Sequence, residues 1–304
     1  MIKEWTDRHL KGDPVIWFIV FALSVLSILV VYSATGTLAY ARMEGNTEHY
    51  LIKHSLLVGM SLFVMWLAHK IDYRYYAKLS KLALWISVPL LFITWQFGLN
   101  INEASRWITI PIINQAFQPS DLAQFALIVN LSAMLAKRQK NIEDIKESLI
   151  PMLLWIGVIC GLIAMTNLSS ALLIFSTCMV VMFIGRVPMQ YLMMLVVIGA
   201  LAGSLAMVFG QRAETAISRI ENYISSDEIP YQAEQSYIAI ANGGIKGLGP
   251  GKSQRRNFLP HPYSDFIYAI IIEEYGLIGG VLVLFLYLAL LYRGTRVVTT
   301  SERT

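Results

Sequence analysis

The chain has 304 residues, of which 56% are hydrophobic and 14% charged, with a net charge of +4 and a mean hydropathy of +0.56. This apolar fraction exceeds what the core of a soluble domain of this length can bury, so the composition excludes a water-soluble globule and indicates a multi-spanning membrane protein. The two cysteines, Cys160 and Cys178, both lie in apolar stretches, which excludes a disulfide framework or a cysteine-based metal site.

Apolar runs long enough to cross about 30 Å of hydrocarbon recur along the whole chain. They predict an all-α polytopic membrane protein with about eight transmembrane helices, at residues 15–35, 51–69, 82–99, 119–136, 148–165, 168–185, 189–209 and 264–292. Most of the 24 lysines and arginines fall in the N-terminal segment, the tail, and the loops after the second, fourth and sixth helices. The positive-inside rule therefore predicts that both termini are cytoplasmic.

Two segments on the opposite, outer side carry more chemistry than a connector needs. One covers about residues 100–118, and the other, a large loop between helices 7 and 8, covers about residues 211–263. Long loops without regular structure are uncommon unless they are functional or mobile. Within the second loop, RAETAISRIENYI has Ala213, Ile217 and Ile220 at helical spacing, which predicts an amphipathic helix on the outer membrane surface.

The first outer segment leads into the fourth helix. Arg106 and Trp107 pair a cation with an amphipathic aromatic ring, and anchoring at the membrane interface accounts for that pair. In QPSDLAQFAL, Ser120 is the predicted N-cap and Asp121 lies in the first turn, so local capping accounts for both residues without catalysis.

The second outer segment contains a glycine-rich, basic loop, GGIKGLGPGKSQRRNFLP. Five glycines allow sharp backbone bends, and the loop offers four cations to an anion: Lys246, Lys252, Arg255 and Arg256. A nucleotide P-loop is not predicted, because Lys246 occupies the position of its first glycine. A lipid-linked phosphate or pyrophosphate fits such a loop at a membrane surface. The alternative is a solvated loop whose charge is incidental.

Three acids accompany the last span. In HPYSD we expect Ser264 to cap the helix and Asp265 to lie in its first turn, either as a capping charge or as a functional acid at the membrane edge. Glu273 and Glu274 lie deeper, where an ionised carboxylate must be paired, hydrated or protonated. Both a direct role and a role as hydrogen-bond partners that fix the packing remain open for them.

A glycine pair in the same span, Gly276 and Gly280, predicts a small-xxx-small contact with a neighbouring helix.

Four blocks of the sequence resemble the SEDS family, the shape, elongation, division and sporulation proteins. They are VYSATG, RWI followed by QPSDLAQFAL, NLSSALLI, and QSYIAIANGGIKGLGPGKSQRRNFLPHPYSDFIYAIIIEEYGLIGG. NEASRWI and FQPSD are more similar to the FtsW-like division branch than to the RodA-like elongation branch. The resemblance implies one SEDS-type transmembrane domain over residues 1–304. Family members have ten spans, so we expect either that the sequence is a fragment or that the last two helices are dispensable.

The resemblance also implies an activity. It is that of a peptidoglycan glycosyltransferase that polymerises lipid II into glycan strands at the outer face of the bacterial cytoplasmic (inner) membrane during cell division, releasing undecaprenyl pyrophosphate. The implied partners are a class B penicillin-binding protein and other divisome membrane proteins, and no nucleic acid.

Residue roles follow from matching the family's motifs to this sequence. The essential aspartate of the DFI motif corresponds to Asp265, the sensitive outer-loop tryptophan to Trp107, and the acid of the PSE motif to Asp121. Gln124 stands where the family has a lysine. We expect Asp265 to act as the general base, and either a set of basic side chains or a divalent ion such as Mg²⁺ or Mn²⁺ to neutralise the departing diphosphate. That set is Arg106, Lys246, Lys252, Arg255 and Arg256, with Ser120, Gln124, Glu273 and Glu274 in supporting positions.

Two other functions fit the same composition. Buried acids and a basic vestibule also suit a flippase for lipid-linked precursors, although carriers usually show internal repeats that are absent from this sequence. A non-catalytic scaffold that activates a penicillin-binding protein is the other alternative.

Overall fold

The computed structural model describes residues 12–36, 47–101, 104–110, 115–209 and 229–300. The chain divides into two compact units, one formed by residues 1–71 with 226–304 and the other by residues 72–225. The amphipathic helix predicted around Ala213, Ile217 and Ile220 lies outside the described residues. The prediction of a single transmembrane domain over 1–304 stays a prediction.

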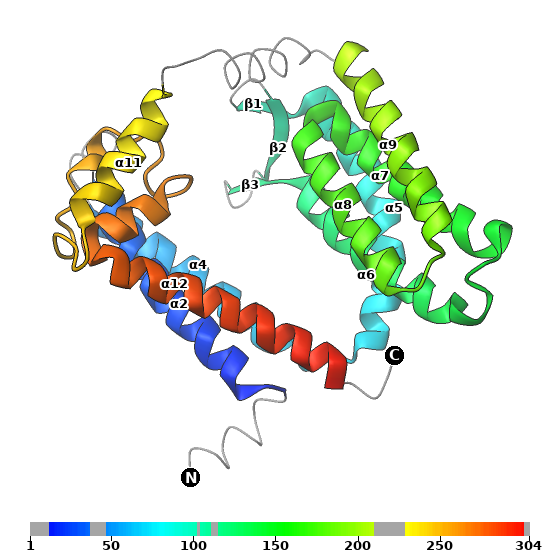
Figure 1. Ribbon diagram of the computed structural model, residues 1–304, viewed down its shortest axis with the longest axis horizontal. Coiled ribbons are helices and arrows are strands. Elements are labelled where there is room, and N and C mark those ends of the chain that lie inside the picture. The colour runs from blue at the N-terminus through cyan, green and yellow to red at the C-terminus, as the bar shows by residue number, and fades with distance from the viewer. Residues whose placement is uncertain (1–11, 37–46, 102–103, 111–114, 210–228, 301–304) are drawn as a thin grey trace. The chain divides into compact units, whose positions relative to one another are not determined.

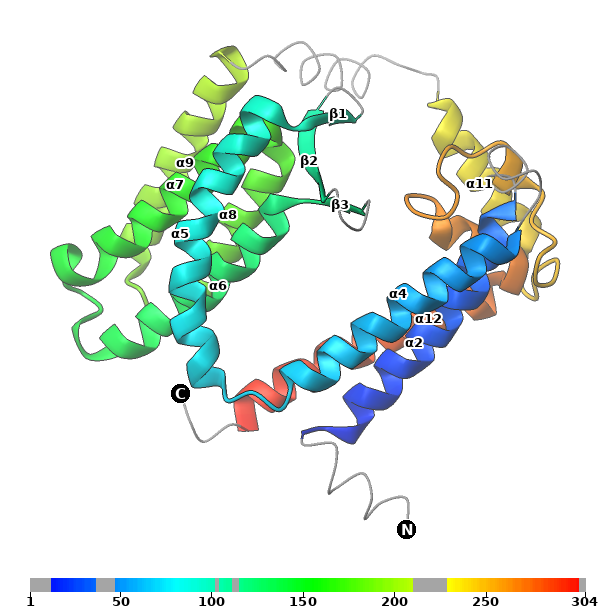
Figure 2. The same cartoon turned by 180° about the vertical axis from the view of Figure 1, so that it is seen from behind.

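The first unit combines the two ends of the sequence. Its helices are α2 (Pro14–Ala34), α4 (Thr47–Ala68), α11 (Tyr231–Gly243) and α12 (Ile267–Thr300). Figures 1 and 2 show α2, α4 and α12 side by side, with α11 packed on the first half of α12. The contact between α2 and α12 buries Val30, Ile271 and Val283. Burial of these apolar side chains holds the first and last spans together.

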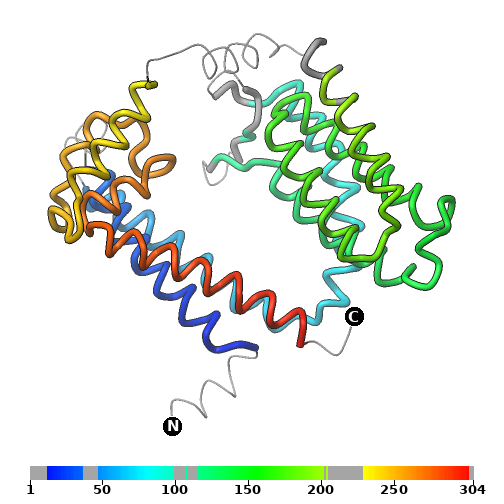
Figure 3. Tube along the Cα trace, in the orientation of Figure 1, coloured from blue at the N-terminus to red at the C-terminus, as the bar shows by residue number. Residues whose placement is uncertain are grey.

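In its described residues, the second unit is a bundle of five helices with a small sheet. The helices are α5 (Tyr73–Phe97), α6 (Pro119–Arg138), α7 (Ile150–Thr166), α8 (Leu168–Ile184) and α9 (Met189–Phe209), which can be followed from cyan to yellow-green in Figure 3. One continuous apolar core joins them, and its centre contains Leu84, Leu127, Ile159, Ile163 and Met182.

Two irregular turns connect α6 to α7. A 3₁₀ turn, η1 (Gln139–Asn141), follows α6, and a π-helical turn, η2 (Ile145–Leu149), precedes α7. At the other end of α7, the single residue Asn167 connects it to α8, and the Asn167 side chain accepts a hydrogen bond from the Ser170 N–H at 3.3 Å.

Large apolar side chains cover the outside of the helices. Phe18 of α2, Leu56 of α4 and Phe285 of α12 are 69%, 68% and 62% exposed, and no described residue of α4 is buried. An apolar surface of this extent is stable only in contact with lipid. Six of the described helices are long and apolar enough to span a membrane, and α8 and residues 189–201 of α9 are shorter apolar helices. The protein is therefore a mainly helical, multi-pass membrane protein.

Each of the eight predicted spans coincides with a helix, to within a few residues except at the start of the third and the end of the last. The number of spans and the cytoplasmic position of both termini stay predictions.

The first outer segment contains a sheet that the sequence reasoning missed. Strands β1 (Leu99–Ile101), β2 (Ala104–Ile110) and β3 (Gln115–Phe117) pair antiparallel in the order β1-β2-β3. Aromatic and β-branched residues in RWITIPII were the available signal. The prediction of an all-α fold is thus correct for the spans and wrong for this meander.

Candidate active site

Helix α12 is broken at Gly276. This residue has φ 71° and ψ −176°, a conformation outside the helical region that glycine adopts without steric cost. The nearest atoms to a Cβ at Gly276 would be backbone atoms of Ile245 and Gly247, in the chain after α11, so the predicted small-xxx-small contact with a neighbouring helix is not found at this position. Gly280 is buried as well, but a Cβ there would meet the Ile272 side chain of the same helix at 2.7 Å. The two glycines fit a break in the helix and close packing within it.

The break leaves backbone groups of α12 available, and the chain that follows α11 pairs with them. We call residues 244–256 the α11–α12 loop. The N–H groups of Leu248 and Gly249 donate to the carbonyls of Glu273 and Glu274, each at 2.9 Å. The N–H of Leu277, beyond the break, donates to the carbonyl of Gly244 at 2.9 Å. Irregular backbone inside a membrane protein is tolerated where other protein groups satisfy it in this way.

Close approach of the two backbones explains the glycines at the contact. A Cβ at Gly247 would lie 2.2 Å from the Glu274 carbonyl oxygen, and one at Gly276 would lie 2.2 Å from that of Ile245. The predicted sharp bends are confirmed, since Gly247 has φ 80° and three further glycines of the loop also have positive φ. At Gly247 the glycine is required for packing against α12 as well as for the bend.

Glu273 fixes the second half of the loop. Its carboxylate is fully buried and accepts hydrogen bonds from the Ser253 hydroxyl, from the Gln254 N–H at 3.2 Å and from the Arg255 N–H at 3.3 Å. These donors surround the start of a short 3₁₀ helix, η3 (Arg255–Asn257). Several donors to one carboxylate offset the cost of burying it, so Glu273 acts as an anchor for the backbone that carries the arginines.

Glu274 connects the loop to the first helix of the chain. It is 1% exposed, and its Oε1 accepts from the Ser33 hydroxyl of α2 and from the Ser253 N–H at 3.4 Å. Its Oε2 has no partner within the described ranges. For both glutamates the structure shows the packing role. Ser33 and Ser253 were not singled out from the sequence, although Ser33 lies in VYSATG and Ser253 follows Gly-Lys in the basic loop.

The four cations of the loop fall into two pairs. Lys246 and Lys252 are exposed. Arg255 and Arg256 are half-buried, and each donates one Nη1–H to the protein, Arg255 to the Gln235 side chain at 3.1 Å and Arg256 to the Ser33 carbonyl at 3.0 Å. An arginine carries five N–H donors, so these contacts orient each guanidinium and leave other donors for a ligand.

Asp265 lies in the turn before α12. The helix begins at Ile267, so the prediction that Asp265 occupies its first turn is wrong. The prediction that Ser264 caps the helix is also wrong, because the Ser264 hydroxyl donates to the His261 carbonyl at 3.3 Å. The carboxylate of Asp265 is exposed, and within the described ranges no hydrogen bond or ion pair engages it. A helix-capping role thus does not account for this acid.

A cavity of about 350 Å³ lies beside Arg256 in the same unit. Its lining is mainly apolar, with few polar groups, and comes from α2, the start of α4, the α11–α12 loop and α12. The residues include Leu29, Tyr32, Ser33, Pro250, Arg256 and Tyr275. One guanidinium at the edge of an apolar pocket suits the phosphate of a lipid-linked molecule.

The remaining predicted residues belong to the other unit. Arg106 and Trp107 lie on β2, with Trp107 half-buried and opposite Leu99 of β1. Asp121 is exposed in the first turn of α6, and Gln124 is half-buried one turn later.

The predicted cap of α6 is wrong. Gln118 is the N-cap, no side chain caps the helix, and the Ser120 hydroxyl accepts from the Gln118 side chain at 2.8 Å. Pro119 at the first helical position explains this shift, because proline is favoured there and the helix begins two residues earlier than a Ser120 cap would place it.

A divalent ion at this site would need ligands from the substrate as well as from the protein. Among the described residues, no three His, Cys, Asp or Glu side chains come together. Mg²⁺ is commonly held by one or two carboxylates together with substrate phosphates and water, and an exposed carboxylate such as that of Asp265 can contribute to such a site.

Comparison with known proteins agrees with this architecture. The family described as cell cycle protein, FtsW/RodA/SpoVE, matches residues 14–304. Stage V sporulation protein E of Bacillus subtilis (strain 168) is 30% identical, with 96% of this chain and 80% of that protein covered. A probable peptidoglycan glycosyltransferase FtsW of Geobacter sp. (strain M18) is 30% identical, with 97% and 81% covered.

Two solved structures share the fold. One is a chain from a study of the structural coordination of polymerization and crosslinking by a peptidoglycan synthase complex, with a TM-score of 0.72, 22% identity, and 97% of this chain and 80% of that chain covered. The other is the rod shape determining protein RodA of Thermus thermophilus, with a TM-score of 0.66, 22% identity, and 97% and 77% covered. Because the family matches residues 14–304 and relatives of 30% identity cover nearly the whole chain, the chain belongs to the FtsW/RodA/SpoVE family of cell cycle proteins.

Proposed function

We propose that this protein is a peptidoglycan glycosyltransferase that polymerises lipid II at the outer face of the bacterial cytoplasmic membrane during cell division. Relatives of 28–30% identity that cover nearly the whole chain are named probable peptidoglycan glycosyltransferase FtsW, which supports the activity. The observation that carries the site is the exposed carboxylate of Asp265, which is unengaged within the described ranges and lies in the turn before α12, between that helix and the basic loop that buried acids anchor.

In the proposed reaction Asp265 is the general base. A sugar hydroxyl of one lipid II attacks the anomeric carbon of the growing chain, and the bond from that carbon to the lipid pyrophosphate breaks. The hydroxyl proton passes to the Asp265 carboxylate as the new glycosidic bond forms. Proton transfer of this kind typically contributes about 10²–10⁴ to the rate.

The departing undecaprenyl pyrophosphate requires cations, because negative charge accumulates on it. Lys246 and Lys252 are exposed to meet it, and the donors of Arg255 and Arg256 not used by Gln235 and Ser33 add to them. In this proposal Glu273 and Glu274 act through the backbone, by holding the loop at a fixed position on α12. The tight backbone packing at Gly247 serves the same end.

The second unit supplies the other proposed contacts to lipid II. We assign Arg106, Trp107 and Asp121 to substrate binding, and Ser120 and Gln124 to support of that binding. The partner we propose is a class B penicillin-binding protein, together with other divisome membrane proteins. A peptidoglycan synthase complex among the similar folds supports a partner of this kind.

The test is polymerisation of purified lipid II by the full chain with its partner, using Asp265→Asn and, as a matched control, Glu234→Gln at an exposed position of α11. We expect Asp265→Asn to lower the initial rate of glycan synthesis by about 10²-fold or more, while Glu234→Gln keeps it. Assembly with the partner, measured by co-purification, should survive both changes. Wild-type polymerisation by Asp265→Asn would overturn the base assignment.

The same assay separates the alternatives. In detergent there is no bilayer to cross, so a flippase would show no effect of Asp265→Asn on synthesis. A scaffold would retain its partner's synthesis in full.

A further inference from the structure

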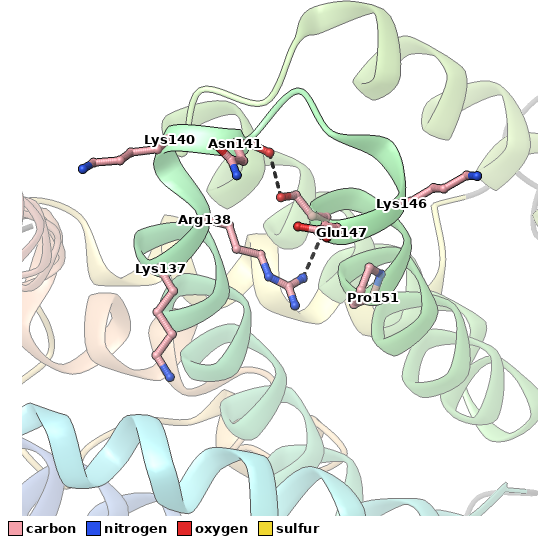
Figure 4. A pocket seen from close by; sticks show the side chains of 8 residues that line it. Lys137, Arg138, Lys140, Asn141, Lys146, Glu147 and Pro151 are labelled. Atoms are coloured by element: carbon pink, nitrogen blue, oxygen red, sulfur yellow. Dashed lines mark hydrogen bonds between the residues drawn. The ribbon is translucent and has the colours of Figure 1, made fainter.

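The connection between α6 and α7 encloses a cavity of about 530 Å³ in the second unit, apart from every residue assigned above. Four basic side chains and one acid line it, together with a buried serine: Lys137, Arg138, Lys140, Lys146, Glu147 and Ser148. Figure 4 shows these residues coming from the end of α6, from η1 and from η2.

Hydrogen bonds give this cavity a defined wall. The Ser148 side chain is fully buried, and its hydroxyl donates to the Asn141 carbonyl at 2.8 Å. The Arg138 guanidinium, which crosses the cavity in Figure 4, donates to the Ser148 carbonyl at 3.3 Å. The π-helical turn that presents Lys146 and Ser148 is a rare conformation that is frequent at functional sites.

The four basic side chains of the rim outnumber the acids of the same connection, Glu143, Asp144 and Glu147, and within the described ranges no ion pair joins the two sets. Asp144 is an N-cap and accepts from the N–H groups of Lys146 at 2.9 Å and Glu147 at 3.1 Å. Lys137 and Arg138 lie in the last turn of α6, where they also balance the helix dipole. That explanation does not extend to Lys140 and Lys146, which lie beyond the helix.

The directions of the lysine side chains around the cavity favour an extended anion over a single small ion. Lys137, Lys140 and Lys146 are exposed and point in different directions in Figure 4, so they do not converge on a single small ion. A ligand with phosphate oxygens spread over several ångströms fits them better. Beside the rim, Ile145 and Ile150 are each 48% exposed, which indicates that this loop meets the apolar edge of the bilayer as well as its charged surface.

We propose that this cavity binds the phosphate headgroup of an anionic membrane lipid, with Arg138 inside and the lysines around it. Basic pockets between the ends of spans are suited to such headgroups, and the basic side of the chain is the side predicted to be cytoplasmic. The site is independent of the proposed glycosyltransferase activity.

The test uses the purified full chain in a neutral detergent, with binding of fluorescent cardiolipin as the readout and phosphatidylcholine as the uncharged competitor. We expect Lys140→Gln with Lys146→Gln to weaken cardiolipin binding by about 30-fold, since each lysine near a phosphate surface contributes about a fivefold step. The matched control is Lys78→Gln with Lys81→Gln, which removes the same charge from exposed positions of α5 in the same unit.

Arg138→Gln provides a second variant, whose folding is checked by thermal unfolding, and it should weaken binding as well. Equal weakening by the α5 control pair would overturn the proposal, because binding would then follow overall charge. Competition by phosphatidylcholine as strong as by unlabelled cardiolipin would overturn it too. Displacement of the lipid by millimolar inorganic phosphate would identify a small-anion site and reject the lipid.

Discussion

The α11–α12 loop and the cavity at the connection between α6 and α7 each present four basic side chains, but the protein holds them in different ways. In the α11–α12 loop, two buried carboxylates and a broken helix fix the backbone that bears the cations. In the α6–α7 connection, a buried serine and one arginine hold the turn, and the lysines stand on an exposed rim.

This difference teaches what each charge is for. Buried carboxylates cost free energy unless they are fully hydrogen-bonded, so an anchor such as Glu273 makes its loop sensitive to uncharged changes that disturb the packing. An exposed rim is insensitive to such changes and responds to changes of charge. Cations on a rigidly held backbone suit a pyrophosphate that takes part in a reaction. Exposed lysines around a cavity suit a lipid headgroup that is bound without reacting.

The largest expected effect comes from Gly247→Ala. The new Cβ would lie 2.2 Å from the Glu274 carbonyl oxygen, a backbone atom that cannot yield, at a residue with φ 80°. We expect the free energy of unfolding to fall by about 2–5 kcal/mol and glycan synthesis to be lost. The measurements are thermal unfolding in detergent and lipid II polymerisation.

Gly251→Ala is the matched control, because Gly251 has φ 76° but no heavy atom within 4 Å of a new Cβ. It should lose only about 1–2 kcal/mol, from backbone strain. Equal losses at both positions would show that the close contact with α12 contributes nothing.

Next in size is Glu273→Ala. The change leaves the Ser253 hydroxyl and the N–H groups of Gln254 and Arg255 without their acceptor, so we expect a loss of about 2–3 kcal/mol and local opening of the loop. Trypsin should then cleave after Lys252, Arg255 and Arg256 much faster than in the wild type. Glu234→Ala, at an exposed position of α11, is the control and should leave the cleavage rate unchanged. Wild-type cleavage in Glu273→Ala would show that Glu273 does not hold the loop in place.

A smaller effect is expected from Ser33→Ala. The change removes the α2 hydroxyl that donates to the Glu274 carboxylate. Within the described ranges, the Ser253 N–H then remains as the donor to that carboxylate. We expect a loss of about 1–2 kcal/mol in thermal unfolding. Ser24→Ala is the control on the same helix, since the Ser24 hydroxyl donates to the Val20 carbonyl of its own turn. An equal loss of stability in the control would show that the hydrogen bond from Ser33 to Glu274 does not contribute.

The smallest effect concerns an acid outside both loops. Asp13 caps α2 and pairs with Arg293 of α12 at 2.8 Å. Desolvation raises the pKa of Asp13, but the Val15 N–H and the Arg293 guanidinium together lower the pKa below its ordinary value of 3.8. The pair therefore contributes stability above pH 3.8, and this contribution disappears as the pH falls through the lowered pKa.

Accordingly, Asp13→Asn should lower the unfolding temperature slightly near neutral pH, and the difference from wild type should vanish in strong acid. A difference that persists in acid would show that the effect of this substitution is not electrostatic.

Much of the fold follows from the sequence. Runs of apolar residues set the spans because a bilayer core accepts only a helix of sufficient length, and this requirement depends on local sequence alone. The charged ends of the spans and the glycine-rich basic loop were predictable for the same reason. Strand β2 could have been predicted from the aromatic and β-branched residues of RWITI. Helix α11 gave a weaker signal, because it has no long apolar run and two of its aromatic side chains, Tyr231 and Tyr237, are exposed.

Tertiary structure decided what the acids do. Asp265, Glu273 and Glu274 look alike as sequence, but only the folded chain brings Ser33, more than 200 positions away, to Glu274 and leaves Asp265 in an exposed turn before the helix. The break at Gly276 also depends on the fold, because it exists only where the α11–α12 loop supplies the missing hydrogen bonds. Hydropathy and spacing report on neighbours along the chain, and a buried carboxylate is satisfied by neighbours in space.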